Sequence, residues 1–405
     1  MRAFSGVFLL VVATDVAGLA LGGKQVIRMK GANHDVPASA AVIAGDYVYV
    51  SGQLGREPDG TFGDIRAQTR RALDNVSAIL QEAGTSLEQA VSGYVYLRNK
   101  GDFAAMNDAY KSHPGWPKTT HKTARGDDLD LAVRTTMTAD LLAPPAALVE
   151  ITIIALRKGA ERTIIQPSEW GTSNLPYPWA IKSGDTLWIS GLVASNKRGG
   201  PYARGDMKTD VKQTLTDIGE ALSTAAMSHA DVVFSRVYIQ DTSLTKEMDE
   251  AYRTFFPRDP PARATLRAGI MGNTNSDEIT TIAIKAPKKA INIPNAEESA
   301  PASTAVVVGD RFFSSGIQGV TDTNRGDAKA QTREALARLG RALKAAGFEW
   351  GHVVDAWILL SDTRDYAAMT EAYREVVPKE FPAWTVVGEQ PLGRGVVQIQ
   401  IMAVR

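Results

Sequence analysis

The chain has 405 residues, with 45 Lys and Arg, 45 Asp and Glu, 44% hydrophobic residues and no cysteine. Its length suggests two to four domains at roughly 100 to 200 residues each, and its composition excludes a disordered, collagenous or coiled-coil chain. The zero net charge gives no overall attraction to nucleic acid or to an anionic membrane. Disulfide, thiol and thiolate-metal chemistry is excluded without cysteine, and five widely spaced histidines form no metal motif: His34, His113, His121, His229 and His352.

The N-terminus has the character of a targeting segment. Arg2 precedes an apolar run over residues 7–13, and small residues follow as far as Ala20. We therefore interpret residues 1–23 as a possible signal peptide, which would make the protein secreted or periplasmic. Two alternatives remain, an upstream start with Met29 as a later candidate or an extra strand, and both would leave the protein cytoplasmic. The apolar run is too short to span a bilayer.

Three copies of one sequence unit fill the rest of the chain. Asp64, Asp206 and Asp327 each begin a helical pattern, and they lie 142 and 121 residues apart. The same two offsets relate Val91, Val233 and Val354, and also Tyr110, Tyr252 and Tyr373. The chain therefore divides into repeats over 24–158, 159–287 and 288–405, with charged linkers near residues 159 and 288.

Each repeat predicts the same order of elements. A short β-branched run (25–27, 163–165, 290–293) precedes a Gly-Asp turn and an alternating strand that ends in Ser-Gly, which is typical of a hairpin. A helix capped by Asp64 and ended by Gly84 follows in the first repeat. A strand over 94–97, a helix over 103–110 and two late strands, the last over 149–154, complete the unit. The order β-β-β-α-β-α-β-β is an α+β fold.

Two helices cover only one face of such a sheet, so the other face needs a cover. Three tandem copies can supply it to one another. We therefore expect a closed ring with pseudo-threefold symmetry and ligand clefts between neighbouring units.

Several short segments of the sequence resemble the Rid family (RidA/YjgF, reactive intermediate or imine deaminases). They are Val50-Ser51-Gly52-Gln53, Pro261-Ala262-Arg263-Ala264-Thr265, residues 134–142 and Val149-Glu150-Ile151. The resemblance covers about residues 24 to 405. It implies a chorismate-mutase-like fold, and it implies that a homotrimer is fused here into one self-contained, monomeric polypeptide.

The resemblance also implies an activity: hydrolysis of enamine or imine acids such as 2-aminoacrylate to a 2-keto acid and ammonia, without metal or organic cofactor. The residue types suit this chemistry, because Arg grips a carboxylate bidentately and Glu can deliver water and protons. By resemblance, Arg263, Glu278 and Tyr177 of the second unit are its catalytic residues.

The other two units retain less of this set. In the first unit Arg134, Glu150 and Asn107 form a second, partial site, because Ala38 stands at the tyrosine position. In the third unit Trp384, Gln398 and Ala302 replace Arg, Glu and Tyr, so we expect an architectural role for that unit. Asp249, at the position of Asn107, would repel a carboxylate.

Three hypotheses about function follow: an imine or enamine hydrolase, a non-catalytic binder or sensor of small keto or imino acids, and an RNA-binding or ribonuclease module. Arg263 and Glu278 could equally be an ordinary cross-strand ion pair. The zero net charge and the lack of a basic stripe with interleaved aromatic residues argue against the RNA module. The insertion from His121 to Asp130, with Arg125 and Asp127, is either a solvated loop or a lid.

Overall fold

A computed structural model describes residues 23–29, 36–119, 121–123, 126–140, 142, 144–200, 202, 204–272, 275–294 and 301–405. Apart from residue 23, the possible signal peptide lies outside these residues, as do His34 and Arg125. None of the helices in the described part combines the length and apolar character that a membrane span requires.

The three units have the predicted α+β order of elements. The first contains β1 (Gln25–Ile27), β2 (Ala41–Ala44), β3 (Tyr47–Val50), β4 (Gln53–Leu54), α1 (Ile65–Glu82), β5 (Ala90–Leu97), α2 (Phe103–Lys111), β6 (Val133–Thr138) and β7 (Val149–Leu156). The second contains β8 (Thr163–Ile165), β9 (Ala180–Ser183), β10 (Thr186–Leu192), α3 (Met207–Thr224), β11 (Val232–Ile239), α4 (Thr245–Phe255), β12 (Ala262–Arg267) and β13 (Asp277–Ile284). The third contains β14 (Lys288–Ile291), β15 (Ala305–Val308), β16 (Arg311–Ser314), β17 (Ile317–Gln318), α5 (Ala328–Ala346), β18 (Val353–Leu360), α6 (Tyr366–Val376), β19 (Ala383–Gly388) and β20 (Val397–Val404).

Local sequence signals account for the ends of these elements. The carboxylates of Asp64, Asp206 and Asp327 each accept a hydrogen bond from the backbone N–H three residues later, and so cap the long helix of their unit. Such a cap contributes about 1 kcal/mol. One boundary differs from expectation, because β14 begins at Lys288, inside the charged stretch 285–289 that the sequence suggested as a linker.

The strand order decides which residues each unit presents to its neighbours. The sheets run β1-β2-β3-β7-β5-β6, β8-β9-β10-β13-β11-β12 and β14-β15-β16-β20-β18-β19. The strands β6, β12 and β19, which carry Arg134, Arg263 and Trp384, are therefore edge strands at one side of each sheet. The strand that carries Glu150, Glu278 or Gln398 lies inside the sheet.

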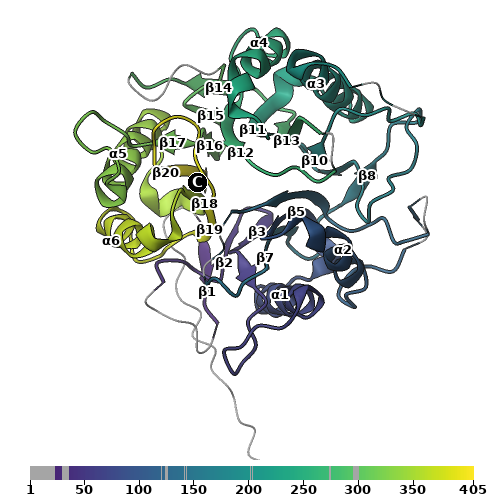
Figure 1. Ribbon diagram of the computed structural model, residues 1–405, viewed down its shortest axis with the longest axis horizontal. Coiled ribbons are helices and arrows are strands. Elements are labelled where there is room, and N and C mark those ends of the chain that lie inside the picture. Colours follow the sequence, from purple (N-terminus) through teal and green to yellow (C-terminus); the bar gives the residue numbers. More distant parts are fainter. Residues whose placement is uncertain are drawn as a thin grey trace, which may run out of the picture.

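Each sheet packs on both faces. The helix pairs α1/α2, α3/α4 and α5/α6 cover the outer faces, and the strands lie toward the middle of the molecule (Figure 1). A buried apolar cluster with members from all three units joins the inner faces; it includes Val42, Tyr49, Trp188, Phe234, Phe313 and Met402. The face that a lone unit would expose is thus covered by the other two units.

One repeat position from each unit meets at the centre. Tyr94, Arg236 and Trp357 are related by the repeat offsets, and the Arg236 Cζ lies 4.6 Å from the Tyr94 ring centre and 4.1 Å from that of Trp357. The Arg236 Nε donates to Gln400 at 2.8 Å. Each unit contacts both others, through β6 and β10, β12 and β16, and β19 and β3. Threefold symmetry among the units stays a prediction.

Candidate active site

The same hydrogen bond joins each unit to the next at three junctions. The backbone N–H groups of Arg134, Arg263 and Trp384 donate to the hydroxyls of Ser190, Ser315 and Ser51, at 3.2, 2.8 and 2.9 Å. We call these junctions cleft 1/2, cleft 2/3 and cleft 3/1, after the units that form them. The serines belong to the Ser-Gly pairs at the ends of the hairpin strands, so this sequence signal marks the inter-unit contact.

Cleft 1/2 holds a buried arginine with unused hydrogen-bond donors. Arg134 is 1% exposed, and its Cζ lies 4.7 Å from the ring centre of Tyr110 in its own unit and 4.6 Å from that of Tyr177 in the second unit. Its Nη2 donates to the Asn107 Oδ1. Its Nε and Nη1 have no hydrogen-bond partner. A buried N–H donor without an acceptor raises the free energy of the folded protein. A guanidinium with two such donors therefore favours binding of an anion.

Glu278 of the second unit faces the same cleft. A Cβ placed on Gly191 would lie 2.0 Å from the Glu278 Oε1 and 3.0 Å from the Thr135 Oγ1, so the carboxyl group rests on the bare Gly191 backbone beside the first unit. Burial raises the pKa of Glu278 to about 8 and the charge of Asp277 adds to this, whereas Arg134 acts against it. Burial likewise raises the pKa of Tyr177 to about 12. At neutral pH both groups carry their protons.

The structure brings the expected site residues together in a different grouping from the one expected from the sequence. Tyr177 and Glu278 meet Arg134 and not Arg263, which lies in cleft 2/3. The arginine strand β6 is an edge strand of its sheet and contacts β10 of the second unit, so Arg134 lies beside residues of that unit. The expected partial site of Arg134, Glu150 and Asn107 is divided in the same way, because Glu150 faces cleft 3/1.

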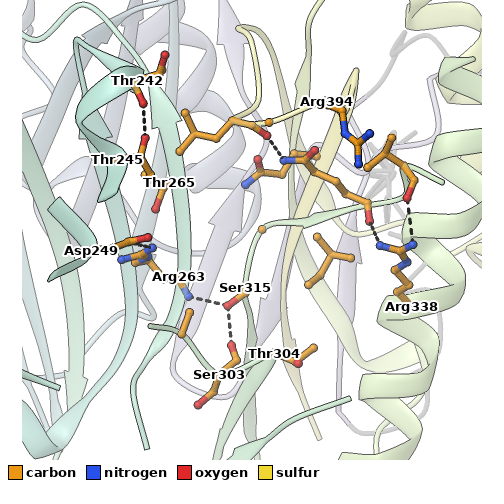
Figure 2. Close-up of a pocket in the computed structure, with 18 residues that line it drawn as sticks. Thr242, Thr245, Asp249, Arg263, Thr265, Ser303, Thr304, Ser315, Arg338 and Arg394 are labelled. Carbon is orange, nitrogen blue, oxygen red and sulfur yellow. Dashed lines mark hydrogen bonds and ion pairs between the residues drawn. The ribbon is translucent and has the colours of Figure 1, made fainter. Parts of the chain in front are cut away.

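Cleft 2/3 opens into a cavity of about 730 Å³ (Figure 2). Here Arg263 forms an ion pair with Asp249, with 2.5 Å between Nη2 and Oδ1, and its Cζ lies 4.7 Å from the Tyr252 ring centre. The third unit contributes Gln398 and Ala302 to the lining, at the positions where cleft 1/2 has Glu278 and Tyr177. At these two positions cleft 2/3 therefore has an amide in place of the carboxyl group and a methyl group in place of the phenol.

Cleft 3/1 has no arginine at the equivalent position. The Trp384 side chain, 6% exposed, packs against Tyr366 and Tyr373, with ring centres 6.0 and 5.5 Å apart. Glu150 rests on Gly52 as Glu278 does on Gly191, burial raises its pKa to about 8, and no cation among the described residues pairs with it. Ala38, the expected tyrosine position of the first unit, packs against the third unit's core.

The insertion of the first unit bonds to that unit and to Arg162 of the second unit, whose Nη2 donates to the Asp130 carbonyl at 2.8 Å. His121 pairs with Asp130 at 3.0 Å, and Asp127 pairs with Lys111 of α2 at 3.0 Å. A lid function for this segment stays a prediction. Within the described ranges, no group of three or more His, Asp or Glu is arranged to hold a metal ion.

The fold defines a class: three repeated α+β units, each a mixed sheet with two long helices. The family model for endoribonuclease L-PSP matches residues 34–157, 172–285 and 294–405. The chain therefore belongs to this family, which is also known as RidA/YjgF, and the resemblance stated from the sequence is confirmed.

Two relatives each match a stretch about as long as one unit. A RutC family protein of Pyrococcus abyssi is 39% identical over 99 residues, which are 24% of this chain and 78% of the relative. The mouse 2-iminobutanoate/2-iminopropanoate deaminase is 29% identical over 126 residues, 31% of this chain and 93% of the relative. A crystal structure of chorismatase aligns with a TM-score of 0.51 at 10% identity, over 78% of this chain and 93% of that chain, a likeness of fold alone.

Proposed function

We propose that the protein hydrolyses small imine or enamine acids to 2-keto acids and ammonia, and that it does so in cleft 1/2. The observation that carries this proposal is the buried Arg134 with two unpartnered donors, held by the uncharged Asn107 and facing the carboxyl group of Glu278. The names of relatives such as the mouse deaminase support the reaction class.

Arg134 binds the carboxylate of the substrate. Hydrogen bonds to charged groups contribute about 1.5–3 kcal/mol each, and the Nε and Nη1 of Arg134 are the donors offered to the carboxylate. The rings of Tyr110 and Tyr177 on either side of the guanidinium hold its plane and exclude water. The substrate C=N group then lies toward Glu278 and Tyr177.

Glu278 transfers the protons. Because its pKa is about 8, it can give a proton to the imine nitrogen at neutral pH, and the resulting carboxylate takes one from the attacking water. Water oxygen bonds to C2 and gives a carbinolamine. A second transfer through Glu278 moves the hydroxyl proton to nitrogen, the C–N bond breaks, and the 2-keto acid and ammonia form. An enamine enters the same sequence after protonation of its terminal carbon.

The test is ammonia release from an imine made in situ by an amino-acid oxidase. Arg134→Ala and Glu278→Gln are expected to lower the rate by at least about a hundredfold. Glu150→Gln is the matched control, because it makes the same change to the equivalent carboxyl group of cleft 3/1.

Two outcomes would count against the proposal. A rate lost in Arg263→Ala and retained in Arg134→Ala would restore the grouping expected from the sequence. Saturable binding of 2-ketobutyrate in calorimetry, with no ammonia released from any imine, would favour the non-catalytic binder.

A further inference from the structure

Cleft 2/3 repeats the arginine site of cleft 1/2 without its net charge. Asn107 and Asp249 occupy the same repeat position, and each accepts a bond from the Nη2 of its arginine. Arg134 is bonded to a neutral amide and keeps its positive charge, whereas Arg263 is neutralised by the ion pair with Asp249. A carboxylate ligand therefore gains little at Arg263, because repulsion from Asp249 offsets its attraction to the guanidinium.

The ion pair still offers hydrogen bonds of both kinds. The Nη2 of Arg263 donates to the Oδ1 of Asp249, and its Nη1 contacts the Met248 Sδ at 3.8 Å. The Nε of Arg263 and the Oδ2 of Asp249 make no hydrogen bond within the part of the chain that the structure describes. Both residues line the cavity. The pair thus presents one donor and one acceptor to a ligand, with no net charge.

Gln398 of the third unit lies beside this pair, at the position where cleft 1/2 has Glu278. A Cβ placed on Gly316 would lie 1.9 Å from the Gln398 Nε2, and the Gly316 N–H donates to the carbonyl of Arg263 at 3.1 Å. Gln398 is 2% exposed, and its Oε1 is buried without a hydrogen-bond partner. Because an unmet buried acceptor is costly, the site favours a ligand that donates an N–H or O–H group to it.

The other cations of the cavity do not change this balance. Figure 2 shows Arg338 and Arg394 across the cavity from Arg263. Arg338 pairs with Glu334 at 2.9 Å. Arg394 is exposed, so solvent screens its charge. The group of the ligand that reaches the Arg263 end is therefore selected by hydrogen bonding and not by charge.

We propose that cleft 2/3 is a second binding site, for an uncharged primary carboxamide. The carbonyl of the ligand accepts from the Nε of Arg263, and its NH2 group donates to the Oδ2 of Asp249 and the Oε1 of Gln398. The cavity of about 730 Å³ leaves room for the rest of the ligand. The site goes beyond the proposed hydrolysis, because the amide of Gln398 cannot transfer protons as Glu278 does.

Calorimetric titration of the full chain tests this site with 2-oxobutanamide, the carboxamide of 2-ketobutyrate. For so small a ligand the expected Kd is on the order of millimolar. The N,N-dimethyl derivative has no N–H donor and should bind at least about tenfold more weakly. Arg134→Ala, which changes cleft 1/2, should retain binding of 2-oxobutanamide and lose binding of 2-ketobutyrate.

Asp249→Asn, made in the Arg134→Ala background, should reverse the preference of cleft 2/3. It copies the Asn107 arrangement, so it restores the charge of Arg263 and removes the Oδ2 acceptor. Binding of 2-oxobutanamide should weaken at least about tenfold, and binding of 2-ketobutyrate should appear, which cannot result from unfolding. Gln398→Leu should weaken 2-oxobutanamide without this gain.

Three results would overturn the proposal. They are no saturable heat with 2-oxobutanamide at concentrations on the order of tens of millimolar, equal binding of the dimethyl derivative, and loss of 2-oxobutanamide binding in Arg134→Ala. None of these outcomes depends on whether cleft 1/2 hydrolyses imines.

Discussion

Gly191→Ala tests whether the position of Glu278 controls the reaction. The new Cβ would lie 2.0 Å from the Glu278 Oε1, 2.9 Å from its Cδ and 3.0 Å from the Thr135 Oγ1. Nonbonded carbon and oxygen atoms need more than 3 Å, so the carboxyl group must move by more than about 1 Å. A displacement of that size can cost roughly a hundredfold in rate, which corresponds to about 2.7 kcal/mol.

The assay is kcat/KM for imine hydrolysis, together with the urea midpoint of unfolding. Overpacking itself costs about 1–3 kcal/mol of stability, so a control must separate instability from misplacement. Gly52→Ala provides it, because its Cβ would lie 1.8 Å from the Glu150 Oε1 in cleft 3/1. We expect similar losses of stability in both variants and a loss of activity in Gly191→Ala alone. Wild-type activity in Gly191→Ala, or equal losses in both, would refute the role of Glu278.

Three further predictions concern charge. For the wild type, kcat/KM should fall as the pH rises through about 8, because Glu278 loses its proton above its raised pKa. The pH profile of Glu278→Gln should lack this fall. Asn107→Asp should raise the KM by roughly ten- to a hundredfold by neutralising Arg134; steady-state kinetics beside Asn107→Ala show whether the charge matters. Lys197→Ala should lower the free energy of unfolding by about 3–5 kcal/mol, because Asp217 is then buried without its cation. Arg198→Ala, at the half-exposed pair with Glu220, should lower it by less than about 1 kcal/mol. Urea unfolding measures both.

Much of the fold could be predicted because its causes are local in the sequence. The aspartates that cap the long helices, the Gly-Asp turns and the alternating strands recur at two fixed offsets, and the structure has an element at each. The repeat also predicted that sheet faces would need covering by other units. Short pairings such as β4 with β7 were missed, since two residues give no periodic signal.

The residues of the candidate site could be predicted from the sequence, but which of them lie together could not. Arg134, Tyr177 and Glu278 were all named from the sequence, yet each was assigned to its own unit. Which edge of one sheet meets which strand of the next depends on packing between units, and no local pattern encodes it. One bond that fixes the contact, from the Arg134 backbone N–H to the Ser190 hydroxyl, joins residues 56 positions apart.

The division of cleft 1/2 between two units has a consequence for behaviour on dilution. Where a site lies between separate subunits, assembly follows mass action, and sites vanish when the concentration falls below the dissociation constant. In this chain Arg134 and Glu278 are joined through residues 135–277, and a covalent link of this kind holds partners at an effective concentration on the order of millimolar. Turnover per chain should therefore be the same at the lowest concentrations the assay can detect as at high ones.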